Sequence, residues 1–100
     1  MKTTLPELIG YIRDKIPRLR LYDVFMILCL IDKELVGRRG FSLTGLEWTY
    51  KDGQLYWEDE EVRTELELNR EAKEVIDQII ESVKDLDDKE VRDLVKKEFV

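Results

Sequence analysis

Carboxylates are the commonest side chains in this chain that could do acid–base or metal chemistry. They cluster in three places, namely Asp32 with Glu34, the run 58–61, and Asp87 with Asp88. A catalytic carboxylate needs burial or a close partner to shift its pKa, and the sequence predicts neither. The spacing of Asp87 and Asp88 also lacks the alternating ligands of an EF-hand loop. We therefore expect solvated or helix-capping roles for these carboxylates.

Other reactive groups are scarce. The chain has no His and a single Cys, which removes the commonest general base and the ligands of a zinc site. Cys29 lies in an apolar run and is expected to be a buried, inert thiol. Ser42 and Ser82 lack a base partner and a nucleophile-elbow motif, and the glycines of 37–45 form no phosphate-binding fingerprint. We predict no catalytic site, no metal and no cofactor.

The stretch that must position everything else is residues 20–36. Eight consecutive apolar residues, 24–31, leave this segment with no polar face, so other elements must surround it. The run is too short to cross a bilayer, and the segment is too long for an ordinary strand. We predict a buried central helix that ends before Gly37, with Arg38 and Arg39 next to its negative end.

Three further helices are predicted from apolar residues at helical spacing and from capping residues. They cover residues 5–16, 70–84 and 88–98, with the N-caps Thr4, Asn69 and Asp87. Pro17 should end the first of them.

A β-hairpin is predicted for residues 46–51 and 54–58, where the apolar residues alternate with polar ones. Asp52-Gly53 between them is a strong signal for a two-residue type I′ turn. Residues 62–68 alternate like a strand but are rich enough in Glu to allow a helical turn, and both readings stay open.

The alternation of apolar and polar residues predicts the register of this hairpin, because a slip of one residue would mix apolar and polar side chains on each face. Pairing Lys51 with Gln54 gathers the apolar residues on one face, which must then lie on the helices: Leu46, Trp48, Tyr50, Leu55 and Trp57. The opposite face carries Glu47, Thr49, Gln54, Tyr56 and Glu58. The predicted fold is thus a single α+β domain over 1–100, mainly helical, with four helices and one hairpin.

Charge is unevenly distributed along the chain. Residues 1–57 hold nine Lys and Arg against seven Asp and Glu, whereas residues 58–100 hold eight against sixteen. An acidic C-terminal part repels phosphate, so a nucleic-acid surface would have to lie in the first half. The high share of charged residues (40%) and the few amides are typical of proteins from hot environments.

Binding to another protein is the function that this composition favours, since catalytic groups are missing. Tyr and Arg are enriched at protein interfaces. The candidate partner-binding residues are Arg38, Arg39, Tyr56 and Lys51. The start of the chain has no signal-like apolar region, so we expect a cytoplasmic protein without a membrane segment. A homodimer remains an open alternative.

The alternative function is that of a winged-helix-like DNA-binding regulator, because two helices followed by a hairpin match that plan. Its nucleic-acid candidates are Arg13, Lys15, Arg18 and Arg20. A recognition helix must present polar side chains to bases, and the helix before the hairpin is mostly apolar. Protein binding is therefore preferred.

Several motifs resemble the Panacea antitoxin domain family. They are the end of the apolar helix at 30–34 (LIDKE), the segment 39–50 (RGFSLTGLEWTY), and the two closing segments 68–76 and 86–95. The likeness covers about three-quarters of the chain. It departs from the family after the strand, where 51–54 (KDGQ) replaces the usual aromatic residue and Gly-Pro pair. The resemblance implies a mostly helical, non-enzymatic module that binds and neutralises a toxin protein.

Overall fold

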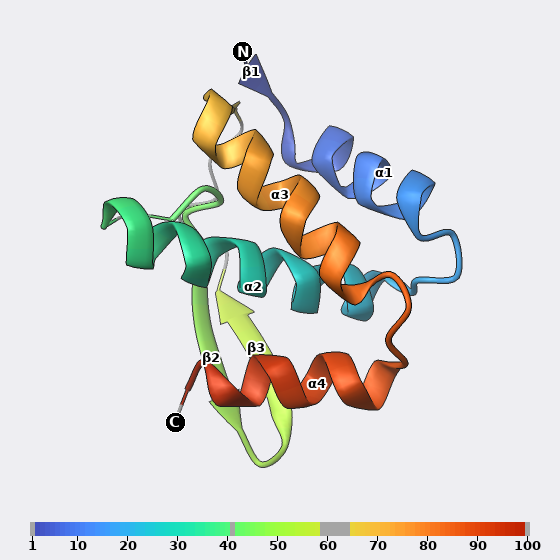
Figure 1. Ribbon diagram of the computed structural model, residues 1–100. Helices are drawn as coiled ribbons and strands as arrows, with labels where there is room; N and C mark the ends of the chain where they lie inside the picture. Colours follow the sequence, from blue (N-terminus) through green and yellow to red (C-terminus); the bar gives the residue numbers. More distant parts are fainter. Residues whose placement is uncertain (1, 41, 59–64, 100) are drawn as a thin grey trace.

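The computed structural model describes residues 2–40, 42–58 and 65–99. Their order of elements confirms the mainly helical α+β fold class. In chain order they are β1 (Lys2–Thr3), α1 (Leu5–Lys15), α2 (Leu21–Arg39), β2 (Glu47–Lys51), β3 (Gln54–Glu58), β4 (Leu66–Glu67), α3 (Arg70–Val83) and α4 (Asp88–Lys97), as Figure 1 shows.

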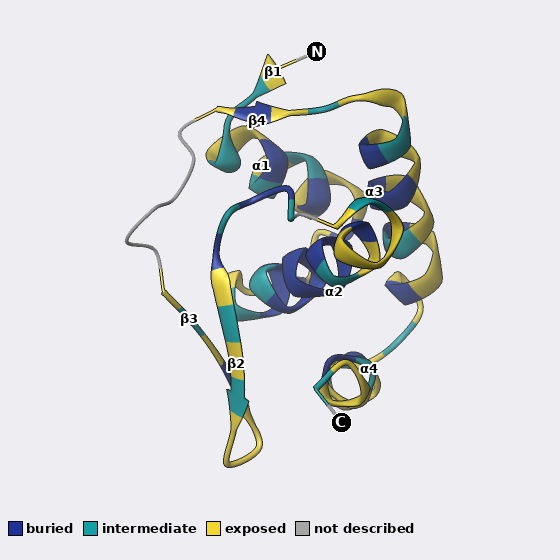
Figure 2. Ribbon diagram, turned by 90° about the vertical axis from the view of Figure 1, so that its left-hand side faces the viewer, coloured by how far each residue is buried: buried dark blue, intermediate teal, exposed yellow. Residues whose placement is uncertain are grey.

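Helix α2 is the centre of the molecule, as predicted. Ten of its 19 residues are buried, including every residue from Met26 to Asp32. Figure 2 shows α2 in the middle, with α1, α3, α4 and the β2–β3 hairpin around it. An element that is apolar on all sides is stable only when it is covered in this way, because burial of apolar surface drives folding.

The predicted end of α2 is wrong by three residues. The helix continues through Gly37 to Arg39, and Gly40 is the C-cap, with φ of +83° and its N–H bonded to the Val36 carbonyl at 2.9 Å. A glycine inside a helix costs only about 1 kcal/mol, so Gly37 does not stop the helix. A left-handed residue is what ends it, and Gly40 adopts that conformation without a Cβ penalty.

The other helices begin and end close to the predicted residues. Each predicted N-cap side chain accepts a hydrogen bond from the backbone N–H three residues later, at 3.3 Å for Thr4 and 2.8 Å for both Asn69 and Asp87. Helix α1 ends at Lys15 because Ile16, which precedes Pro17, leaves the helical conformation. These boundaries depend on capping residues and on a proline that lie within a few positions of each helix end, so they can be predicted from the sequence.

The hairpin has the predicted register, with Trp48 opposite Trp57 and Lys51 opposite Gln54. Both turn residues, Asp52 and Gly53, have positive φ (53° and 77°), as a type I′ turn requires. Side chains along β2 alternate between exposed and half-buried (Figure 2). The hairpin therefore has one face on the helices and one in solvent.

A second, very short sheet joins two distant parts of the chain. Lys2 pairs with Glu67 and Thr3 with Leu66 in an antiparallel ladder between β1 and β4. Within the ambiguous segment 62–68, the structure thus has a strand at Leu66–Glu67, while residues 62–64 lie outside the described part. Two-residue strands carry no periodic signal, so the sequence did not indicate β1.

Candidate functional site

Asp32 lies in the core, and the prediction that placed it on a solvated face is wrong. Only 1% of its surface is exposed. Its carboxylate accepts hydrogen bonds from the backbone N–H groups of Leu43 (2.9 Å) and Thr44 (3.1 Å), from the Thr44 hydroxyl, and from the Trp48 indole N–H (2.9 Å). A buried carboxylate is tolerated because these donors satisfy its oxygens.

This network attaches the hairpin to α2. The Thr44 hydroxyl also accepts the backbone N–H of Leu46 at 3.1 Å, so the turn before β2 is fixed at both ends. The donors come from residues 11 to 16 positions beyond Asp32 in the chain. Both carboxylate oxygens accept hydrogen bonds from protein groups, so Asp32 anchors the turn and β2 to α2.

Aromatic packing holds the inner face of the hairpin in the same way. The Trp57 ring stacks on Phe25 of α2 with 4.3 Å between ring centroids and 3° between the planes. The Tyr22 hydroxyl accepts the Leu55 N–H at 2.7 Å and donates to the Leu55 carbonyl at 3.4 Å. At the other end, Tyr50 stacks on Phe99, which follows α4 (5.9 Å). The hairpin is therefore supported along its length.

The opposite face, which we call the hairpin outer face, consists of the exposed side chains Glu47, Thr49, Lys51, Gln54, Tyr56 and Glu58. Tyr56 is 49% exposed although it is a large aromatic residue. Its hydroxyl donates to Gln54 Oε1 at 3.3 Å. A shallow depression runs beside it, bordered by Lys51 and Glu58. This face places two predicted partner-binding residues, Tyr56 and Lys51, on one surface.

The other two predicted partner-binding residues lie elsewhere. Arg38 pairs with Glu34 (3.0 Å) and donates to Gln78 of α3 (3.3 Å). Arg39 is half-buried in the last turn of α2. Figure 1 shows α3 and the hairpin on different sides of α2, so the four candidates do not form a single surface.

Two of the nucleic-acid candidates have structural contacts within the chain. Arg18 donates to the backbone carbonyls of Lys84 (2.8 Å) and Leu86 (2.5 Å), which caps the end of α3. Arg20 is the N-cap of α2, and its guanidinium contacts Asp88 at 3.2 Å. Arg18 therefore ties the connector between α1 and α2 to the connector between α3 and α4, and Arg20 ties the start of α2 to the start of α4.

The remaining nucleic-acid candidates are exposed on α1. The Lys15 ammonium lies 5.5 Å from the centre of the Tyr11 ring, and Arg13 is exposed in the same last turn. Phosphate binding favours a continuous basic stripe of available cations, and two of these four, Arg18 and Arg20, are engaged in internal contacts.

The single thiol of the chain is shielded from solvent. Cys29 is fully buried, and its desolvation raises the pKa of the thiol to about 12. No group of three or more His, Cys, Asp or Glu that could hold a metal ion occurs within 2–40, 42–58 and 65–99. In the same ranges, none of the helices is long and apolar enough to cross a membrane.

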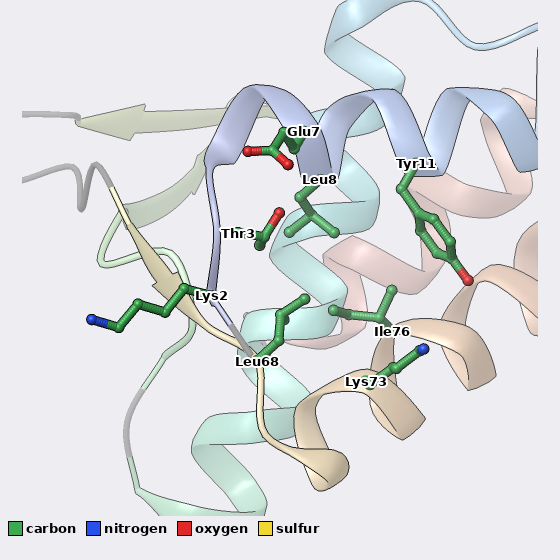
Figure 3. Close-up of a pocket in the computed structure, with 8 residues that line it drawn as sticks. All are labelled: Lys2, Thr3, Glu7, Leu8, Tyr11, Leu68, Lys73 and Ile76. Atoms are coloured by element: carbon green, nitrogen blue, oxygen red, sulfur yellow. The ribbon is translucent and has the colours of Figure 1, made fainter.

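A cavity of about 290 Å³, which no sequence pattern indicated, lies between β1, α1, β4 and α3 (Figure 3). We call it the N-terminal cavity. Its apolar wall is Leu8, Leu68 and Ile76, and polar side chains surround this wall. The cavity depends on the pairing of β1 with β4, which joins residues more than 60 positions apart, so no local pattern could reveal it.

Comparisons with known proteins identify no relative. No family model matches the chain, and no curated protein or solved structure matches it either. The resemblance to the Panacea antitoxin domain family thus rests on the sequence motifs and stays a prediction.

Proposed function

We propose that this chain is a small, non-enzymatic module that binds another protein through the hairpin outer face. The observation that carries the proposal is Tyr56, a half-exposed aromatic residue on a surface whose reverse side is packed against α2. Exposed Tyr is a preferred contact residue because it offers a large area and a hydroxyl with few rotatable bonds.

Rigidity favours this face as a binding surface. The Phe25–Trp57 stack and the Asp32 network hold the hairpin before any partner arrives. A surface that is already ordered loses little conformational entropy on binding, which leaves more of the contact energy as affinity.

Charge indicates the chemistry of the partner. The outer face and the adjacent turn carry one cation, Lys51, against three carboxylates, Glu47, Asp52 and Glu58. The whole chain has a formal net charge of −6. Electrostatic complementarity therefore favours a partner with a basic surface.

The resemblance to the Panacea antitoxin domain family supports a more specific role, neutralisation of a toxin protein by direct contact. The test is coexpression of the chain with the product of the neighbouring gene in the native genome. We expect the neighbour to arrest growth when expressed by itself, growth to recover with the chain, and the two proteins to copurify. A harmless neighbour that does not copurify would contradict the toxin-neutralising role.

DNA binding through a winged-helix arrangement is the competing function. Helix α2, which precedes the hairpin, is the buried helix, and the side chains of Arg18 and Arg20 make internal contacts. We therefore expect no gel shift with random duplex DNA at about 50 mM salt, where phosphate contacts are strongest. A salt-dependent shift under these conditions would favour the regulator.

A further inference from the structure

The N-terminal cavity has an apolar wall with opposite charges beside it. Figure 3 shows Leu8, Leu68 and Ile76 pointing toward one another, with Glu7 and Lys73 on opposite sides of them. Leu8 and Ile76 are almost completely buried and belong to the core, so they form the floor of the cavity, whereas Leu68 is half-buried and offers apolar surface to a ligand.

Lys73 is the cation available to a ligand. Among the described residues, none forms an ion pair with its ammonium group. Lys2, the other lysine of the lining, extends away from the apolar wall in Figure 3 and contacts Glu65 at 3.6 Å. An anionic group that entered the cavity would therefore meet Lys73 rather than Lys2.

Two other polar residues of the lining, Tyr11 and Glu7, already have hydrogen-bond partners within the protein, and Thr3 adds an uncharged hydroxyl. The Tyr11 hydroxyl donates to Asp77 Oδ1 at 2.6 Å, and this hydrogen bond raises the pKa of Tyr11, so the residue stays neutral. Glu7 accepts the Thr4 hydroxyl at 3.0 Å in the first turn of α1. Glu7 remains a negative charge at its side of the cavity, where it repels a second anion.

We propose that the N-terminal cavity binds a small aliphatic monocarboxylate, with its hydrocarbon chain against Leu68, above the floor formed by Leu8 and Ile76, and its carboxylate at Lys73. A cavity of about 290 Å³ suits a chain of medium length. Glu7 makes the site selective for one terminal carboxylate, because a dicarboxylate of equal length would place its second charge near a like charge. This site is separate from the hairpin outer face and does not rest on the proposed protein-binding function.

Octanoate is the probe, and suberate, the dicarboxylate of the same length, is its matched control. We expect octanoate to shift the backbone NMR signals of the residues around the cavity in a saturable way. The expected Kd is roughly millimolar, as befits a ligand of about ten heavy atoms. Suberate should bind about fivefold more weakly, the effect of one charge pair at a partly exposed site.

Three variants separate the contributions of the charges. Lys73→Met keeps the aliphatic stem and should weaken octanoate binding about fivefold, whereas Lys2→Met should change it less than about twofold. Glu7→Gln preserves a side chain that can complete the helix cap and should improve suberate binding toward that of octanoate.

Three results would overturn the monocarboxylate site. The first is the absence of saturable shifts at about 30 mM octanoate, well above the expected Kd. The second is equal binding of octanoate by the wild type and by Lys73→Met. The third is a set of shifts that appear instead at exposed apolar residues such as Leu21 and Val36. All measurements use the isolated full chain, so they succeed or fail independently of any protein partner.

Discussion

Asp32 fixes the position of the hairpin on α2, because its carboxylate accepts hydrogen bonds from the turn before β2 and from Trp48. A neutral amide at this position would keep one acceptor oxygen and would place an NH₂ group against other donors. Unsatisfied buried groups cost more than a hydrogen bond contributes when it is made. The position of the turn before β2 thus depends on one side chain in α2.

We expect Asp32→Asn to lower the free energy of unfolding by about 3 kcal/mol, measured by urea denaturation. Asp14→Asn, at an exposed position of α1, is the control and should change it by less than about 0.5 kcal/mol. A loss below about 1 kcal/mol for Asp32→Asn would mean that the carboxylate does not hold the turn.

The Cys29 thiol makes the free energy of unfolding depend on pH in the alkaline range. Its pKa is raised by burial from 9.0 to about 12 in the folded protein, so the folded state holds the thiol proton more tightly than the unfolded state. The resulting stability, about 4 kcal/mol, is complete below pH 9 and disappears as the pH rises toward 12.

The difference in unfolding free energy between the wild type and Cys29→Ala isolates this contribution. We expect the wild type to lose its stability more steeply than the variant between pH 9 and the onset of alkaline unfolding. Parallel curves for the two proteins would show that the thiol does not titrate differently on folding. Other alkaline groups, including the lysines, cancel in this comparison because both proteins contain them.

At the scale of elements, alanine substitutions at two glycines test where α2 ends. Gly37 lies inside the helix and Gly40 is left-handed, and a Cβ atom added at either position would have no neighbouring atom within 4 Å. Crowding therefore cannot explain a difference between alanine substitutions at the two sites. Only the backbone conformation differs.

Gly40→Ala should destabilise the protein by about 1 kcal/mol, because an L residue is strained at positive φ. Gly37→Ala should stabilise it by about 0.5–1 kcal/mol through helix propensity. Thermal unfolding would register these changes as melting temperatures shifted by roughly 4–8 °C per kcal/mol in opposite directions. Shifts of the same sign would place the helix end elsewhere.

The elements that could be predicted are those with local signals. The N-caps of α1, α3 and α4 and the register of the hairpin depend on residues within a few positions of one another, so the sequence displays them. Features that depend on distant partners could not be predicted. Asp32 is bonded to donors 11 to 16 residues later, Arg18 caps a helix 66 residues away, and β1 pairs with β4.

The candidate site was predictable in part for the same reason. Alternation along β2 and β3 is a local pattern, and it suffices to place Tyr56 and Lys51 on the solvent face. The choice of Arg38 and Arg39 rests on the enrichment of Arg at interfaces, which is a property of the residue type and gives no position. Their place in the fold depends on α2, which continues three residues beyond its predicted end, and Arg38 donates to Gln78 of α3.

At the scale of the whole molecule, α2 separates two surfaces with different properties. The hairpin tip and β1 lie at opposite ends of the molecule in Figures 1 and 2, so the outer face and the N-terminal cavity are far apart. The outer face carries acidic side chains and Tyr56, whereas the cavity has an apolar wall. A substitution at one surface should therefore leave binding at the other unchanged.

The hairpin outer face is the proposed contact surface for the partner. Tyr56 (49% exposed) and Val36 (45% exposed) offer a matched pair, because both are large, exposed apolar residues but only Tyr56 lies on the hairpin. Substitution of either by Ala should leave the unfolding free energy within about 1 kcal/mol of the wild type.

The most direct test is the Kd of the copurified partner for the wild type, Tyr56→Ala and Val36→Ala, measured by calorimetry. We predict at least a roughly tenfold weaker Kd for Tyr56→Ala, the loss expected of a central aromatic contact, and less than about a twofold change for Val36→Ala. Wild-type affinity in Tyr56→Ala would contradict the claim that the partner binds at the hairpin.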